Sequence, residues 1–132
     1  MWRRFKNNPR GKSVGDCVVR AVSAALGTDW YEAYDLLCEE GRWRGDMPDA
    51  DSTMGALLRD FGFKRHAIPE YYPEHYTAAD FAYDHPRGVY VLAFGGHVVT
   101  VIDGQIMDSW DSENEVPIYY YSRRRPHRRA LW

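Results

Sequence analysis

The sequence predicts an α+β fold in which helices from the N-terminal half pack on a C-terminal antiparallel sheet. Two observations support this prediction. Between residues 17 and 61, apolar side chains recur every three or four positions, as in amphipathic helices. From residue 89 onward, the apolar runs are short, rich in valine and isoleucine, and separated by glycines, as in strands.

Composition indicates one compact domain spanning residues 1–132. A chain of 132 residues with 45% hydrophobic and 15% aromatic side chains is long enough to bury a substantial core. Residues 1–14 are basic and turn-rich, so we expect an extended arm anchored on the domain by Trp2 and Phe5. Residues 123–132 form an arginine-rich tail.

Each expected helix carries start or stop signals. Asp16 is placed to cap the first helix and Gly27 to end it, while Asp29 begins a capping box for the second helix. Gly41 is expected to end the second helix. The predicted helices are residues 17–26, 30–39 and 53–61, followed by a short helix that starts after Thr77 and ends at Tyr83.

The strands are expected mainly in the last third of the chain. The pair Asp103-Gly104 is typical of a tight hairpin turn between two strands. An apolar run over residues 89–94 is expected to be a central strand because it is hydrophobic on both faces. The predicted strands are residues 63–68, 89–94, 97–102, 105–110 and 118–122.

The first helix begins with Cys17, which is the first candidate for chemistry. Free backbone N–H groups and the positive end of the helix dipole favour a thiolate at this position. A buried cysteine with a purely structural role is the alternative interpretation. The second cysteine, Cys38, lies on an amphipathic helix without a partner motif, so we expect it to contribute to packing.

The hairpin register supplies two partners for the thiol. If Asp103-Gly104 forms a two-residue turn, His97, Asp108 and Trp110 lie on one face of the sheet, with Asp108 diagonal to His97. A three-residue turn would instead bring Asp111 opposite His97. Asp108 is therefore the predicted partner and Asp111 the alternative.

These residues together predict nucleophilic catalysis. Cys17 would attack a carbonyl, His97 would act as general base and then general acid, and Asp108 would orient the imidazole. The backbone N–H of Cys17 is a candidate oxyanion donor.

The pattern resembles the papain-like cysteine peptidase superfamily. A cysteine at a helix start within Gly15–Leu26 is followed by Gly-His-Val-Val and a strand aspartate within Tyr90–Trp110. Within the superfamily it is most similar to compact bacterial and phage forms such as bacteriocin leader peptidases. The resemblance implies a papain-like fold and a peptide or protein substrate. The implied reaction is cleavage or transfer at an amide, isopeptide or thioester carbonyl through an acyl-thioester, without a cofactor.

One position departs from the family pattern. Papain-like enzymes place a glutamine about six residues before the nucleophile, where this chain has Gly11. Asn8 or Ser13 are candidate substitutes for its oxyanion-stabilising amide. The departure leaves a second prediction open, namely a catalytically inactive papain-like module that binds a protein or nucleic-acid partner.

Charge and cysteine content set the remaining expectations. A net charge of −2 gives no overall signal for nucleic-acid binding. Two cysteines, no secretory signal and no apolar run of membrane-spanning length favour a cytoplasmic protein that does not bind membranes. The histidines outside position 97 lack metal-ligand spacing, so no metal site is expected. The tail is either a solvated terminus or a contact for nucleic acid or an acidic partner through Arg123, Arg124, Arg125, Arg128 and Arg129.

Overall fold

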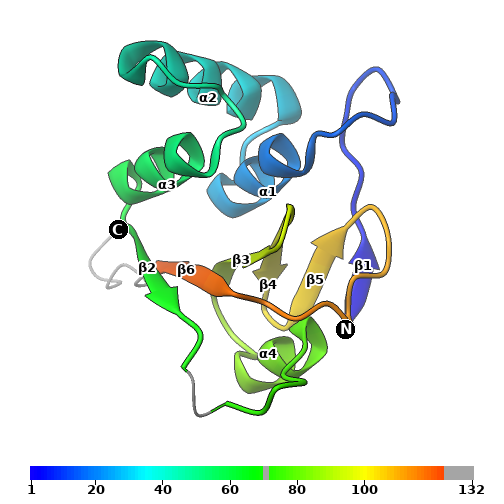
Figure 1. Cartoon of the computed structure of the whole chain (residues 1–132). Coiled ribbons are helices and arrows are strands. Elements are labelled where there is room, and N and C mark those ends of the chain that lie inside the picture. The colour runs from blue at the N-terminus through cyan, green and yellow to red at the C-terminus, as the bar shows by residue number, and fades with distance from the viewer. Residues whose placement is uncertain (70–71, 124–132) are drawn as a thin grey trace, which may run out of the picture.

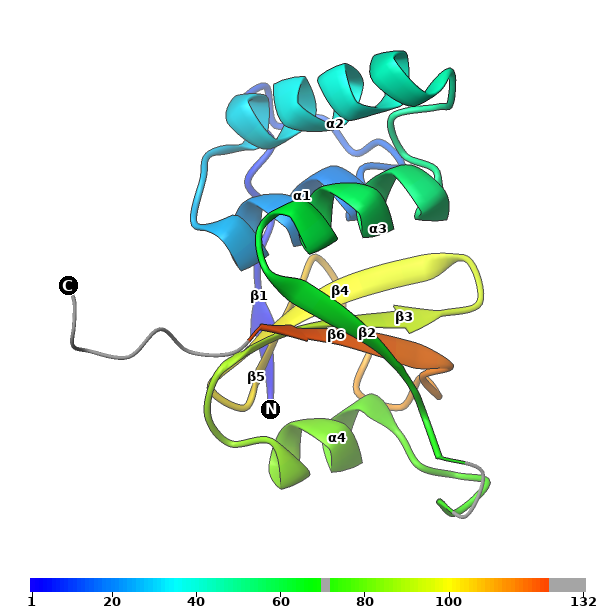
Figure 2. The same cartoon turned by 90° about the vertical axis from the view of Figure 1, so that its left-hand side faces the viewer.

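The computed structural model describes residues 1–69 and 72–123 and shows a layered α+β arrangement. The helices are α1 (Cys17–Leu26), α2 (Trp30–Arg44), α3 (Asp51–Asp60) and α4 (Ala78–Asp84). Helices α1 and α3 cover one face of a sheet, α2 packs on the outer side of these two helices, and α4 covers the other face, as Figures 1 and 2 show. The strands are β1 (Trp2–Arg4), β2 (Phe63–Ala67), β3 (Val89–Phe94), β4 (His97–Ile102), β5 (Gln105–Asp108) and β6 (Tyr119–Arg123).

The C-terminal strands pair antiparallel as predicted, but the complete sheet is mixed. The strand order is β1-β5-β4-β3-β6-β2, and β1 pairs with β5 in parallel. Part of the basic arm is therefore an edge strand, and β2 closes the opposite edge by pairing with β6. A strand of three residues is too short to show the alternation by which a strand is recognised, so its pairing was hidden in the sequence.

Two apolar clusters lie on the two faces of the sheet. The first joins α1, α2 and α3 to β3, β4 and β6, with Val22, Leu37 and Leu58 fully buried. The second packs Phe81 of α4 against residues of β3, β4 and β5 such as Ile106. Burial of such side chains is the main force that holds the helices on the sheet.

Helix α1 lies directly over β4, and this contact places the N-terminus of α1 beside the start of that strand. The hydroxyl of Thr100 donates to the carbonyl oxygen of Ala21 at 2.6 Å across the interface. The helix spans the predicted residues and ends at Gly27, whose φ of 70° suits a residue without a side chain.

Helix α2 is longer than predicted because Gly41 lies inside it and does not end it. A Cβ atom at Gly41 would come within 2.8 Å of the Asp46 carbonyl oxygen, so this glycine permits close packing. The helix ends at Gly45, where φ is 68°.

Helix α4 has a side-chain cap at its start, whereas α3 has none. Thr77 and Asp80 form the predicted capping box at α4. Helix α3 starts at Asp51 without a side-chain cap, and the Thr53 hydroxyl donates to the Met47 carbonyl oxygen at 2.7 Å. Among the described residues, no helix combines the length and the apolar character needed to cross a bilayer.

Candidate functional site

The three predicted site residues come together at one end of the sheet. Cys17 is the first residue of α1, His97 the first of β4 and Asp108 the last of β5. The hairpin has the predicted register, because Val101 pairs with Ile106. Its turn residues have positive φ, as a tight turn that matches the strand twist requires.

The carboxylate that meets the imidazole belongs to Asp108. His97 Nε2 lies 2.8 Å from Asp108 Oδ2, which leaves Nδ1 available to Cys17. The alternative residue, Asp111, is exposed, and its carboxylate accepts a hydrogen bond from the backbone N–H of Glu113.

The imidazole is held in its charged form. Burial alone would lower the pKa of His97, but hydrogen bonding and charge interaction with Asp108 and Cys17 raise the pKa to about 9. At neutral pH, His97 is therefore an imidazolium whose two N–H groups can donate hydrogen bonds to Asp108 and to the Cys17 sulfur.

The same contacts act on the thiol in the opposite sense. Burial raises the pKa of Cys17, but hydrogen bonding from His97 and from the backbone N–H of Val98 lowers it more. The positive charges of His97 and Arg20 add to this effect, so the pKa of the thiol lies below its ordinary value. Both shifts favour a thiolate–imidazolium pair, which is the activated form of a cysteine nucleophile.

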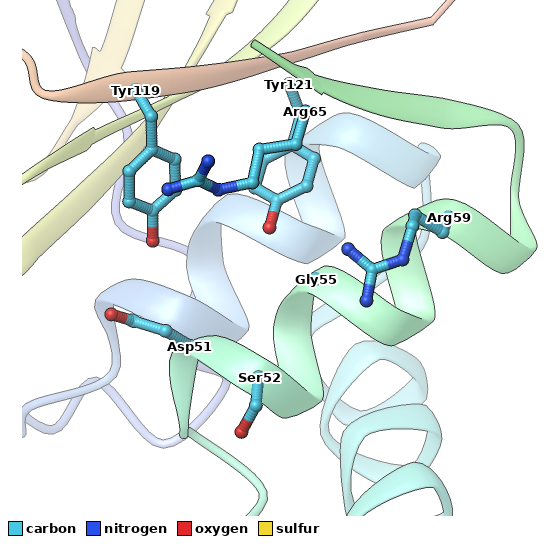
Figure 3. Close-up of a pocket in the computed structure, with 7 residues that line it drawn as sticks. All are labelled: Asp51, Ser52, Gly55, Arg59, Arg65, Tyr119 and Tyr121. Carbon is cyan, nitrogen blue, oxygen red and sulfur yellow. The ribbon is translucent and has the colours of Figure 1, made fainter. Parts of the chain in front are cut away.

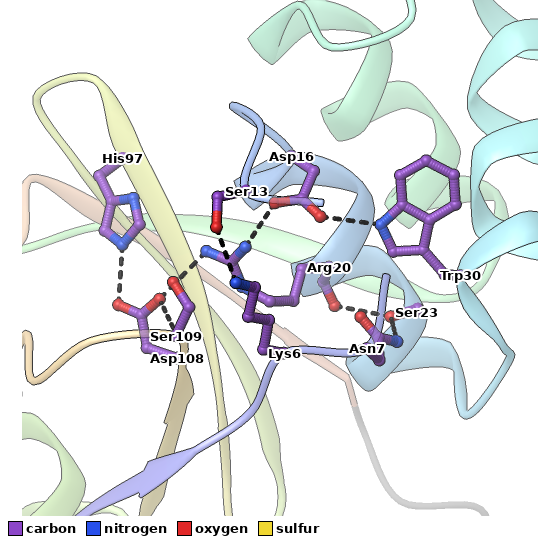
Figure 4. A network of polar contacts seen from close by, with 10 residues as sticks. All are labelled: Lys6, Asn7, Ser13, Asp16, Arg20, Ser23, Trp30, His97, Asp108 and Ser109. Atoms are coloured by element: carbon purple, nitrogen blue, oxygen red, sulfur yellow. Dashed lines mark hydrogen bonds and ion pairs between the residues drawn. The ribbon is translucent and has the colours of Figure 1, made fainter. Parts of the chain in front are cut away.

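A buried chain of charges supports the imidazole from behind, as Figure 4 shows. The Asp108 side chain is 0% exposed, and its Oδ1 accepts from Arg20 Nη2 at 3.1 Å and from the Ser109 backbone N–H at 2.7 Å. Arg20 Nη1 donates to Asp16 Oδ1 at 2.6 Å, and Trp30 Nε1 donates to Asp16 Oδ2 at 2.9 Å. Each carboxylate oxygen of the two aspartates therefore has a donor, as buried charges require.

The charge state of Asp108 follows from these donors. Burial raises the pKa of Asp108, but hydrogen bonds from His97 and Ser109 together with the charge of His97 lower it below the ordinary value. Asp108 thus remains a carboxylate and holds the imidazole in one orientation.

Sequence reasoning missed the part of this network formed by Arg20. The helix that contains Arg20 is otherwise apolar or small, and Arg20 is only 6% exposed. The available signal was one arginine on an apolar helix, four residues after an aspartate. That spacing brings the two side chains together on one face of a helix.

Asp16 also differs from the capping role predicted for it. It occupies the N-cap position of α1, but its side chain caps no backbone N–H and instead binds Arg20 and Trp30. The N–H groups in the first turn, including that of Cys17, consequently lack a capping side chain. Such groups are suitable donors to an oxyanion that develops beside the sulfur.

Two aromatic rings flank the imidazole. The Trp110 ring centroid is 5.0 Å from that of His97, as the predicted register implies, and the Phe94 centroid is 6.0 Å away. Trp110 is 45% exposed, so it lies between part of the imidazole and solvent. Partial exclusion of water strengthens the ionic hydrogen bond behind the ring.

The nucleophile opens onto a cleft of about 320 Å³. Cys17, His97 and Gly15 line one part of the cleft, and Asp49 and Asp51 line another. The cleft thus exposes the Cys17 sulfur to solvent-accessible space that also has acidic side chains in its lining.

None of the residues considered as oxyanion substitutes contacts Cys17 through a hydrogen bond in the described chain. Gly11 contributes no side chain and has a φ of 66° in a turn. The Asn8 side chain accepts from the backbone N–H of Arg10 at 2.8 Å, and Ser13 accepts from Lys6 Nζ at 2.8 Å. The backbone N–H groups at the start of α1 are therefore the donors nearest the sulfur in sequence.

The remaining candidates lie away from this cluster. Cys38 is half-buried in the interior of α2. Arg123 belongs to β6, and its guanidinium carbon is 4.8 Å from the centroid of the Phe63 ring. Within residues 1–69 and 72–123, no group of three or more histidine, cysteine or acidic side chains is placed to hold a metal ion. The other tail arginines, Arg124, Arg125, Arg128 and Arg129, lie outside the described residues.

Comparison of the chain with protein-family models, with curated proteins and with solved structures gave no match in any of the three.

Proposed function

We propose that this chain is a papain-like cysteine hydrolase that cleaves or transfers an acyl group at an amide, isopeptide or thioester carbonyl. The observation that carries the proposal is the alignment of Cys17, His97 and Asp108 beside a cleft, with the thiol pKa lowered and the imidazole pKa raised. A pair of this kind is a ready nucleophile and a ready acid.

Catalysis follows from the two protonation states. The Cys17 thiolate attacks the carbonyl carbon, a C–S bond forms, and the carbonyl π electrons move to oxygen. The His97 imidazolium then protonates the leaving nitrogen or sulfur as its bond to carbon breaks, which leaves an acyl-thioester and a neutral imidazole. The imidazole takes a proton from water, hydroxide adds to the thioester, and the thiolate leaves.

Further groups support these steps without forming a covalent bond to the substrate. Asp108 stabilises the imidazolium before it donates its proton, and the uncapped N–H groups of the first α1 turn stabilise the oxyanion. Two unpaired cysteines fit a reducing compartment, so we place the protein in the cytoplasm.

A matched set of variants tests the proposal. Peptidyl acyloxymethyl ketones, which alkylate an activated cysteine, are expected to label the wild type and Cys38→Ala but not Cys17→Ala. We expect His97→Ala to lose at least about tenfold in labelling rate. Intact-mass measurement and peptide mapping identify the modified residue. Equal labelling of the two cysteines in the wild type contradicts the proposal.

A second candidate is an inactive papain-like module that binds a protein or nucleic acid. The observation that favours it is Gly11, which supplies no oxyanion-stabilising amide. A partner that binds with the same affinity to the wild type and Cys17→Ala, together with an unreactive Cys17, identifies this alternative.

A further inference from the structure

A second pocket, of about 310 Å³, adjoins the catalytic cleft and has the opposite charge. Figure 3 shows its lining, which α3, β2 and β6 contribute. Asp51 lines both this pocket and the cleft beside Cys17, so the two spaces share a wall. The residues Arg59, Arg65, Tyr119 and Tyr121 form the part of the second pocket that we call the arginine pocket.

The two guanidinium groups of the arginine pocket are held by aromatic side chains. The Arg65 guanidinium carbon lies 4.0 Å from the centroid of the Tyr119 ring, a cation–π arrangement that fixes its position. Arg59 extends from α3 toward the phenol of Tyr121 (Figure 3). Burial raises the pKa of Tyr121, so this phenol keeps its proton at neutral pH and remains a donor.

A glycine opens the space in which these groups meet. A Cβ at Gly55 would fall on the Tyr121 hydroxyl oxygen and within 3.4 Å of Arg59 Nη1. Gly55 lies in the middle of α3, where glycine costs about 1 kcal/mol of helix stability relative to alanine. A glycine, which disfavours the helix, therefore lies where the Tyr121 phenol and the Arg59 guanidinium approach α3.

The charges of this pocket are not balanced within the described chain. Among residues 1–69 and 72–123, neither Arg59 nor Arg65 forms an ion pair with a carboxylate. The lining carries two guanidinium groups and one carboxylate, that of Asp51. Burial raises the pKa of the Tyr119 phenol, and the nearby Asp51 carboxylate adds to this effect. One added carboxylate would balance the lining, and guanidinium groups are well suited to bind it.

We propose that the arginine pocket binds an acidic side chain of the substrate, so that the enzyme acts on acyl groups within acidic peptides. This inference rests on the proposed hydrolase function and adds its substrate class. The shared wall at Asp51 lets one extended peptide place its carboxylate between Arg59 and Arg65 and its carbonyl at Cys17.

Paired electrophilic probes test the inference. Three tripeptide chloroacetamides carry one glutamate at the first, second or third position, and three partners carry glutamine there, so that each pair differs in one charge. We expect at least one glutamate probe to label Cys17 about fivefold faster than its glutamine partner. In Arg59→Gln and Arg65→Gln, this preference should fall below about twofold.

Two controls separate the possible outcomes. Arg42→Gln removes an exposed arginine of α2 outside both pockets and should keep the preference. Iodoacetamide, which is neutral and small, should label Cys17 equally fast in all these variants. The proposal that the arginine pocket binds an acidic side chain is contradicted if no glutamate probe reacts faster than its glutamine partner. It is also contradicted if Arg42→Gln loses the preference as fully as the pocket variants do. Failure of iodoacetamide to distinguish Cys17 from Cys38 in the wild type overturns the hydrolase proposal instead.

Discussion

Helices α1 and α2 both start after an aspartate, but the two carboxylates bind different partners. Asp29 adopts the extended backbone of an ordinary N-cap, and its Oδ1 accepts from the Glu32 backbone N–H at 2.8 Å. Asp16 has a φ of −106° and a ψ of 23°, and its side chain binds Arg20 and Trp30. One helix start thus contributes to helix stability, and the other leaves its first N–H groups open beside Cys17.

The comparison of Asp16 with Asp29 shows that a buried cation can prevent an N-cap aspartate from capping its helix. A missing side-chain cap costs a helix about 1 kcal/mol. Arg20, at 6% exposure, would lose much more without its carboxylate partners, because an unpaired buried charge costs several kcal/mol. Asp16 therefore binds the Arg20 guanidinium. As a consequence, the backbone N–H groups in the first turn of α1, beside Cys17, have no capping side chain.

The largest expected effect is that of removing the carboxylate at α1. Asp16→Ala leaves Arg20 with one carboxylate partner and Trp30 Nε1 without its acceptor, so we expect a loss of about 3 kcal/mol or more in the free energy of unfolding. Urea denaturation measures this loss. In an Arg20→Met background, the same substitution should cost less than half as much, because the buried charge is gone. Equal costs in both backgrounds would show that the ion pair is not the cause.

The second prediction concerns the pH dependence of the two cysteines. At pH 6, a thiol of ordinary pKa is only about 0.3% ionised, whereas a thiol of lowered pKa is ionised to a larger extent, although its thiolate is a weaker nucleophile. We therefore expect iodoacetamide to modify Cys17 about tenfold faster than Cys38 at pH 6. His97→Ala should reduce this advantage and move the rise of the Cys17 rate to higher pH, because burial is then opposed only by the Val98 backbone N–H and the charge of Arg20.

The third prediction concerns alkaline pH, where stability and activity depend on the protonation of His97. Its folded-state pKa of about 9 exceeds the value of about 6.5 in an unfolded chain. Stabilisation by the imidazolium is therefore complete below about pH 6.5 and is lost as the pH rises toward 9. Hydrolysis should decline over the upper part of this range, because the acid that protonates the leaving group disappears. A Cys17 alkylation profile that matches that of Cys38 at every pH would contradict both assignments.

The elements that the sequence predicted correctly depend on neighbours in the chain. The extent of α1, the capping box at Thr77 and the turn at Asp103-Gly104 each depend on a few consecutive residues. The turn then fixes every pairing of the hairpin, so a local signal was enough to place Asp108 beside His97.

The features that were missed depend on distant neighbours. Gly41 looks like a helix end until residues 46–48 fold back against it, and β1 becomes a strand only by pairing with β5. Arg20 meets Asp108 across 88 positions of sequence. No period or spacing encodes such contacts, and the same holds for the arginine pocket, which three separate elements build.

The smallest expected effect tests the ordinary helix start. Asp29→Ala removes the hydrogen bond to the Glu32 N–H at an exposed position, so we expect a loss of about 1 kcal/mol in the free energy of unfolding. The rate of Cys17 alkylation should stay unchanged, because the Asp29 carboxylate binds the Glu32 backbone N–H and, within the described residues, forms no hydrogen bond or ion pair with the charge network behind His97. Urea denaturation and iodoacetamide kinetics on the same preparation give both values. A change in Cys17 reactivity without further loss of stability would mean that the start of α2 controls the nucleophile, most directly through Trp30, which follows Asp29 and donates to Asp16.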